Sequence, residues 1–468
     1  MGNQQEKEEQ MNATYEEQLK KFTSNPKEYG KNLIQCIFIY IIIYYYLVFN
    51  SKPDLKIMRE NVKLIKKKII NDIANKDTDR YKAYCSIFGA FIGDALGSYV
   101  EFSERSENNS KKILVKNNIF GFAPGQVTDD SEMSMSFAFS IMDSPNLTDI
   151  DQDLLYFYYG IWRSTNPQDI GTTTRVALQF FKLDTFTIDI KNEYAKHKDT
   201  LKELASKSLA NGFIMRISTV IVWYYYRNKE KILETLSKKE TEGQYQLYLD
   251  IKNKVSKDTE MTHPNRQNSV ASAVFVYMGL CAMVTGDAKK VIEMLRLLLQ
   301  HEDFSDSKVN EDEITVRKLV IDTSLDQFIK SDYDPETFFK AVSEEHIGWY
   351  AHGFRLTLYY LVNIDKYFNY RDIINHICNL GGDTDTNAAI VGSVLGPILG
   401  FNKLGNTETE IVLSVVPKGR FGYCAAMMYY YIQYLEESNK EIKEKKEVTD
   451  IRYNYIKMLL GLIYKRIE

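Results

Sequence analysis

Two short polar runs contain the residues whose types and spacing suit metal-assisted chemistry. Residues 381–387 (GGDTDTN) alternate carboxylates with hydroxyls after two glycines, and residues 128–132 (TDDSE) have a similar composition. Carboxylate and hydroxyl oxygens are the ligands that Mg²⁺ prefers, and this ion takes about six of them. Each run also suits a helix N-terminus, because Asp, Ser and Thr are common N-caps. Their shared composition favours one metal site formed between the two runs, provided that the fold brings them face to face.

A glycine-rich stretch at residues 87–102 (IFGAFIGDALGSYVEF) is expected to position further acidic side chains. Its glycines recur every four residues, which gives a helix one smooth face that another backbone can approach closely. Residues 387–400 (NAAIVGSVLGPILG) are smooth in the same way, so we expect these two helices to pack against each other. That contact would bring Asp94 and Glu101 toward residues 381–387.

Three weaker signals lie between these runs. Gly171, which precedes three threonines and an arginine, could begin a helix whose N–H groups bind a phosphate, or it could be an ordinary helix start. Asn211 and Gly212 indicate a turn into a helix. Trp349 and Tyr350 fall on an expected helix with an apolar stripe, where core packing is the simpler interpretation.

Helical patterns dominate the chain from about residue 81 to residue 437, with Gly, Pro, Asn and Asp clusters between them. Period-two alternation is scarce, and residues 113–115 are the best candidate for a short strand. The sequence therefore predicts an all-α body. We expect an extension over residues 1–78, a body over 79–435, and a charged linker with a final helix over 436–468.

Composition narrows the class of protein. The 468 residues include 59 basic and 63 acidic side chains, so the net charge is −4, which argues against a dedicated nucleic-acid binder. Five cysteines are scattered without paired spacing, as in proteins of a reducing compartment. We therefore expect a cytoplasmic protein. We also expect a monomer.

An apolar run at residues 33–49 (LIQCIFIYIIIYYYLVF) needs its own interpretation. It is slightly short for a spanning helix, and its three consecutive tyrosines would suit a membrane interface. Three interpretations stay open: a membrane anchor, a buried or partner-binding helix, and a coding artefact.

Several motifs taken together resemble those of the ADP-ribosylglycohydrolases, the family of dinitrogenase-reductase-activating glycohydrolase and the ADP-ribosyl-acceptor hydrolases. The resemblance covers roughly residues 81–435. The motifs are GDALGSYVEF (93–102), TDDSEM (128–133), NGFIMR (211–216), THP (262–264) and GGDTDT (381–386), in this order.

The resemblance implies a compact all-helical fold with a binuclear cleft for two Mg²⁺ ions, or Mn²⁺ in their place. It implies metal ligands at Thr128, Asp129, Asp130, Asp383, Asp385 and Thr386. It places the catalytic acidic residues at Asp129 or Asp130 and at Glu101. It places the phosphates and adenine along the loop 169–175, which includes Gly171 and Thr172, along the 211–216 turn, which includes Asn211 and Gly212, and at Trp349 or Tyr350.

On this resemblance the metals would hold the ribose 2′ and 3′ hydroxyls, and cleavage would pass through an oxocarbenium-like state, as in glycoside hydrolysis generally. The chain departs from the family at Ala210, where glycine is common, and at Phe213 and Ile214, where small residues are common. These differences leave the shape of the substrate open.

Three functions follow as hypotheses. The first is a Mg²⁺-dependent hydrolase that removes ADP-ribose from a protein side chain, arginine or serine, or from a small conjugate such as O-acetyl-ADP-ribose. The second is a non-catalytic ADP-ribose-binding or crystallin-like structural protein on the same fold. The third is a metal-dependent hydrolase of another class, for example acting on phosphate esters. The intact set of ligand residues favours the enzyme.

Overall fold

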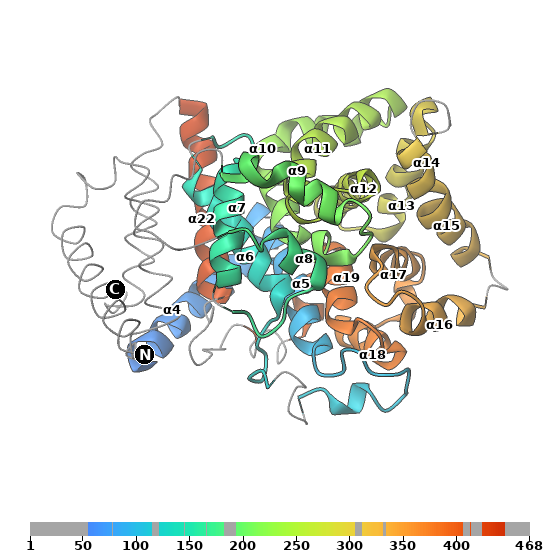
Figure 1. Ribbon diagram of the computed structural model, residues 1–468, viewed down its shortest axis with the longest axis horizontal. Coiled ribbons are helices and arrows are strands. Elements are labelled where there is room, and N and C mark those ends of the chain that lie inside the picture. Colours follow the sequence, from blue (N-terminus) through green and yellow to red (C-terminus); the bar gives the residue numbers. More distant parts are fainter. Residues whose placement is uncertain are drawn as a thin grey trace. The chain divides into compact units, whose positions relative to one another are not determined.

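The computed structural model describes residues 55–76, 78–114, 121–144, 146–164, 166–181, 193–304, 311–330, 334–405, 412 and 424–444. The predicted all-α fold is confirmed, because these residues form helices and turns with only two isolated β-bridges (Figure 1). The predicted strand is wrong where it is described, since Ile113 and Leu114 lie in a turn after the 3₁₀ helix η2 (Ser110–Lys112). The apolar run at 33–49 lies outside the described residues.

Two compact units divide the chain, one from residues 1–67 with 416–468 and the other from residues 68–415. Helix α4 (Leu55–Ile73) crosses the first boundary, and α22 (Cys424–Glu444) belongs to the smaller unit. The larger unit contains the other helices of the described residues. They are α5 (Asp79–Gly97), α6 (Asp129–Asp143), α7 (Gln152–Ser164), α8 (Thr172–Ala177), α9 (Glu193–Ala205), α10 (Ile217–Lys238), α11 (Thr241–Thr262), α12 (Arg266–Thr285), α13 (Ala288–Leu299), α14 (Glu311–Val316), α15 (Thr323–Phe328), α16 (Glu336–Glu344), α17 (Tyr350–Val362), α18 (Tyr370–Leu380), α19 (Thr384–Leu399) and α20 (Phe401–Leu404). Short 3₁₀ turns at η3 (Asn211–Phe213), η4 (Glu302–Phe304) and η6 (Ile364–Lys366) and a π-helix, η5 (Arg317–Asp322), complete it.

Helix α12 is a core helix of this unit. Every residue from Asn268 to Met283 is buried, and most of these residues are apolar, as expected where neighbours surround a helix on all sides. Among the described residues it is also the helix whose length and composition would suit a membrane span, but most of it is buried within the protein. Its apolar character is therefore accounted for by packing.

Helices α5 and α19 pack backbone to backbone, which confirms the predicted contact between the two smooth helices. A methyl group on Gly89 would overlap the carbonyl oxygen of Gly392, and one on Gly93 would overlap that of Ala388. At the same interface the Thr384 hydroxyl donates to the Gly97 carbonyl at 2.7 Å. Small residues let the axes approach closely, and this brings the end of α5 against the beginning of α19.

Candidate metal centre

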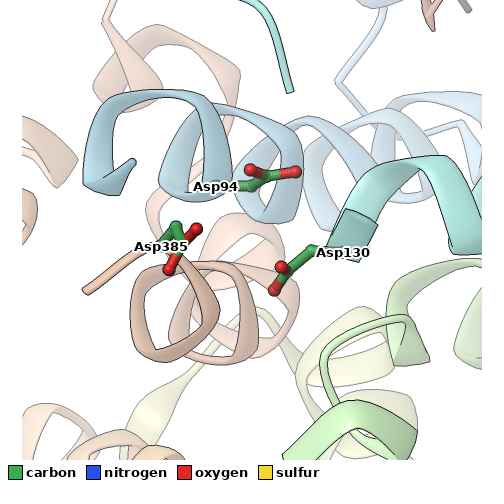
Figure 2. Close-up of side chains that lie close together, drawn as sticks. All are labelled: Asp94, Asp130 and Asp385. Atoms are coloured by element: carbon green, nitrogen blue, oxygen red, sulfur yellow. The ribbon is translucent and has the colours of Figure 1, made fainter. Parts of the chain in front are cut away.

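Two groups of three carboxylates meet where α5, α6 and α19 converge. Asp94, Asp130 and Asp385 each offer an oxygen within 4.8 Å of the other two, and so do Glu101, Asp169 and Asp385. Figure 2 shows Asp94, Asp130 and Asp385 close together, although they come from three different helices. Asp385 belongs to both groups, which we call the first and the second triad.

Asp94 of the first triad also fixes the start of α6. The backbone N–H of Thr128 donates to its two carboxylate oxygens at 2.9 and 3.1 Å, and the Ser131 backbone and hydroxyl donate to Oδ2. The side chain is fully buried, and burial raises its pKa to about 6, although the bonds from Ser131 and Thr128 act in the opposite direction. Asp94 therefore ties α5 to α6 and holds the 128–132 run in the site.

Asp130 is anchored on one oxygen only. The hydroxyls of Thr128 and Thr386 donate to Oδ2 at 3.0 and 3.4 Å, whereas the buried Oδ1 has no hydrogen-bond partner in the part of the chain that the structure describes. Burial, followed by repulsion from Asp94, raises the pKa of Asp130 well above its ordinary value. A buried carboxylate oxygen without a partner is costly unless a cation accepts it as a ligand.

The second triad shows the same feature. Glu101 is buried and its Oε2 has no hydrogen-bond partner among the described residues, while burial and then repulsion from Asp383 raise its pKa to about 10. The loop that follows is held to Gly382: Phe102 N–H donates to the Gly382 carbonyl at 2.8 Å, and Gly382 N–H donates to the Ser103 carbonyl at 3.0 Å. This bridge keeps Glu101 at the beginning of α19.

Other residues of the two runs surround the triads. Asp383 accepts a hydrogen bond from Asn211 Nδ2 at 2.7 Å, and Asp129 accepts one from the Gly171 backbone at 3.3 Å. Burial is the first cause of the raised pKa of both carboxyls, and Asp169 is the next cause for Asp129. Thus the fold does bring the two polar runs together, with Asp130 and Asp385 in the triads and Asp129 and Asp383 beside them.

The site fits hard divalent cations. Its donors are oxygens alone, and each triad has one buried carboxylate oxygen that no hydrogen bond satisfies. Several buried like charges repel one another, so a divalent cation would offset both their desolvation and their repulsion. Carboxylate-rich oxygen sites of this type suit Mg²⁺ or Mn²⁺ rather than softer metals.

Three members of the triads, Asp94, Glu101 and Asp169, were not among the ligands expected from the sequence, although Glu101 was expected as a catalytic residue. A carboxylate on the small-residue face of a helix was the signal for Asp94, because such a group must find partners when a second helix covers it. Asp169 stands two residues before Gly171 without a motif of its own. Burial, followed by repulsion from Asp383, raises its pKa to about 6.

The residues expected to contact phosphate or adenine lie in different surroundings. Asn211 pairs through its N–H with the Gly348 carbonyl at 2.8 Å, which places the 211–213 turn beside Trp349. Trp349 is half-buried, and Gly171 and Thr172 are exposed. Tyr350 is only 1% exposed and packs against Phe213 with ring centroids 5.7 Å apart. Core packing therefore describes Tyr350, and Trp349 is the better placed of the two aromatic residues.

Comparison with known proteins gives one consistent relationship. A family model described as ADP-ribosylglycohydrolase matches residues 75–410. A protein of Acanthamoeba polyphaga mimivirus named as a candidate ADP-ribosyl glycohydrolase, L543, is 26% identical over 349 residues, 73% of this chain and 93% of the relative. The ADP-ribosylarginine hydrolase Tri1 of Serratia proteamaculans (strain 568) is 22% identical over 362 residues, 75% of this chain and 79% of the relative. A solved structure described as an ADP-ribosylglycohydrolase-related protein complex aligns with a TM-score of 0.49 at 16% identity, over 77% of this chain and 99% of that one.

Proposed function

Because the chain belongs to the ADP-ribosylglycohydrolase family and the relatives compared above are named as glycohydrolases or hydrolases, we propose that it cleaves the bond between ADP-ribose and a protein side chain with two Mg²⁺ ions as cofactor. One observation carries the proposal: two triads of carboxylates, buried except for the half-buried Asp169, share Asp385, and each has one buried oxygen without a hydrogen-bond partner among the described residues. Asp94, Asp130 and Asp385 would hold one ion, and Glu101, Asp169 and Asp385 the other. Bound there, the ions would polarise the ribose hydroxyls and activate water.

The protein itself supplies a carboxylate for the two proton transfers of glycoside hydrolysis, one from water and one to the leaving group. Asp129 lies outside both triads and accepts a hydrogen bond from the Gly171 N–H. We therefore propose that Asp129 is the general base that takes the proton from water. Glu101 lies at the start of the loop that follows α5 and belongs to the second triad, so we assign it to metal binding. We propose that Asp129, after it has taken the proton from water, passes this proton to the leaving group. Asp130, which two threonine hydroxyls orient, is assigned to metal binding.

The acceptor residue is the finer part of the proposal. An arginine-linked substrate is our first choice, because the Serratia relative is named an ADP-ribosylarginine hydrolase and aligns over three quarters of this chain. A serine-linked substrate and a small ADP-ribose conjugate are the other choices. The large side chains of Phe213 and Ile214 are fully buried, so they support the 211–213 turn from within the core and are not exposed at its surface.

The experiment compares release of ADP-ribose from arginine-linked and serine-linked substrates, with O-acetyl-ADP-ribose as a third substrate. We expect release from the arginine-linked substrate, loss of release in EDTA and recovery with added Mg²⁺. Asp385→Asn is the inactive control. Release from the serine-linked substrate alone would change the acceptor, and release that persists in EDTA would contradict the metal centre. Binding of ADP-ribose without release from any of the three would favour a binding protein.

A further inference from the structure

Arg216, directly before α10, is a fully buried cation outside the carboxylate site. Its Nε lies 3.2 Å from both carboxylate oxygens of Asp258, and its Nη2 donates to the Asp258 carbonyl and to the Thr262 hydroxyl at 3.0 Å. The guanidinium carbon lies 4.8 Å from the centre of the Tyr159 ring, and the Tyr159 hydroxyl donates to Asp258 at 2.6 Å. Arg216 therefore joins α7, α10 and α11 and has no surface left for a ligand.

One branch of this network points away from Asp258. Arg216 Nη1 donates to the Gly212 carbonyl at 2.6 Å, in the η3 turn. The turn is also tightly packed at the Gly212 Cα, because a methyl group there would lie 2.8 Å from His263 Cε1 and 3.1 Å from the Thr174 hydroxyl. His263 is itself held by a 2.8 Å bond between Nδ1 and the Thr262 hydroxyl. Arg216 and His263 thus clamp Gly212 from two directions.

The clamped turn reaches the metal centre through its neighbour Asn211. Asn211 Nδ2 donates to Asp383 Oδ2 at 2.7 Å, while its backbone N–H donates to the Gly348 carbonyl at 2.8 Å. Asp383 stands directly before α19 and two residues before Asp385, which both triads share. A continuous path therefore runs from Arg216 through Gly212 and Asn211 to the start of α19.

We propose that Arg216, oriented by Asp258, is a positioning residue that holds Asn211 against Asp383 and so sets the geometry of the metal centre. A buried ion pair contributes little net stability, because desolvation of the two charges offsets their attraction. A planar guanidinium with several donors in fixed directions can hold a backbone carbonyl in one place, which a lysine cannot do equally well. Some residues orient a metal ligand without touching the metal themselves. Removing such a residue typically lowers metal affinity about 10–100-fold.

The test measures Mn²⁺ binding to the full chain, by electron paramagnetic resonance and by calorimetry, without any substrate. We expect Arg216→Lys and Asn211→Ala each to weaken Mn²⁺ binding about tenfold or more. The double variant should bind little worse than either single variant, because both remove the same path. Tyr159→Phe is the matched control: it removes one bond to Asp258, leaves the Gly212 contact, and should keep the wild-type affinity.

Wild-type Mn²⁺ affinity in a folded Arg216→Lys protein, or additive losses in the double variant, would overturn the inference. If Arg216→Lys does not fold, Gly212→Ala moves the same turn without touching the ion pair and should cause the same loss of affinity; unchanged affinity there would also overturn it. The inference rests on the metal centre of the proposed function. Failure of the wild-type protein to bind Mn²⁺ would refute that centre, a result distinct from equal binding by wild type and variants.

Discussion

Asp385 is the residue on which both triads depend. Its carboxylate lies within 4.8 Å of oxygens from four other acidic residues, and burial followed by repulsion from Glu101 raises its pKa well above the ordinary value. Its orientation is set locally, because Oδ1 accepts the N–H of Thr386 at 2.9 Å. A single substitution here should therefore affect both proposed cation sites at once.

Asp385→Asn should lower kcat/KM by more than about 100-fold. It removes a ligand of both proposed ions, and this should cost more than the loss of an outer-shell partner, which typically costs about 10–100-fold. In EDTA the variant should be at least as stable as wild type, since one of several mutually repelling carboxylates is gone. Steady-state kinetics measure the first property, and thermal unfolding with and without Mg²⁺ measures the second. A variant that Mg²⁺ stabilises as much as it does wild type would show that Asp385 is not a shared ligand.

The raised pKa values predict how stability depends on pH. Burial raises the pKa of Asp94 and Asp169 from 3.8 to about 6, so the folded protein without a cation keeps these protons to higher pH than the unfolded chain. The stability that this contributes is fully present below pH 3.8 and is lost as pH rises through about 6. A divalent cation binds the deprotonated form, so the rise in Tm caused by Mg²⁺ should increase between about pH 5 and about pH 8. Fluorimetric unfolding in EDTA and in excess Mg²⁺ would detect this; a pH-independent rise would contradict it.

Among the elements, the α5–α19 pair decides the spacing of the site. Asp94 on α5 and Asp385 on α19 approach each other because glycines allow the two backbones to touch. The same closeness makes the pair sensitive to any added side chain, because the atoms that a methyl group would meet are backbone atoms that cannot rotate away.

Gly89→Ala should destabilise the protein by about 1–3 kcal/mol or more and weaken Mn²⁺ binding, because the added methyl group overlaps the Gly392 carbonyl and forces the helices apart. Gly243→Ala in α11 is the matched control, since its methyl group would meet only Thr235 Cγ2 at 3.8 Å. That change should be neutral or stabilise by about 0.4–1 kcal/mol. Chemical denaturation gives both values, and equal effects of the two substitutions would refute the packing argument.

At the scale of the whole molecule, the larger unit coincides closely with the family match at residues 75–410. The predicted extension over residues 1–78 nevertheless contains two contacts to α5. Thr78 caps the helix by accepting the Tyr81 N–H at 3.1 Å, and Asp72 pairs with Arg80 at 3.2 Å. A truncation at residue 78 would therefore remove an N-cap, which typically costs about 1 kcal/mol.

Removal of residues 1–54 should leave kcat and Mg²⁺ dependence unchanged, because the triads and the Arg216 network lie within residues 94–385. Removal of residues 1–78 should retain catalysis with a lower Tm, because the cap and the ion pair are lost. Steady-state kinetics and thermal unfolding of the two proteins beside the full chain test this. Loss of catalysis by the first truncation would show that the extension contributes to the site.

Local chemistry was sufficient to predict part of this molecule. The 3.6-residue periodicity predicted an all-helical body, and the four-residue spacing of glycines predicted that two helices distant in sequence would touch, because both patterns are properties of a single helix face. The polar runs at 128–132 and 381–387 indicated oxygen ligands from residue type alone. Asp169 lies in the loop 169–175 that was expected to contact phosphate, but no local pattern marks it as a metal ligand.

Local residue patterns were enough to predict the helices, the two polar runs and the small-residue faces that bring them together. Long-range packing selected which oxygens share a site. It brought Asp94 and Asp169 into the triads, placed Asp129 and Asp383 beside them, and put Tyr350 in the core. It also joined Arg216 to the metal centre through the 211–213 turn. The physical reason is that helix formation depends on neighbours within a few residues, whereas burial, repulsion and ligand geometry depend on groups that only long-range packing brings within a few ångströms.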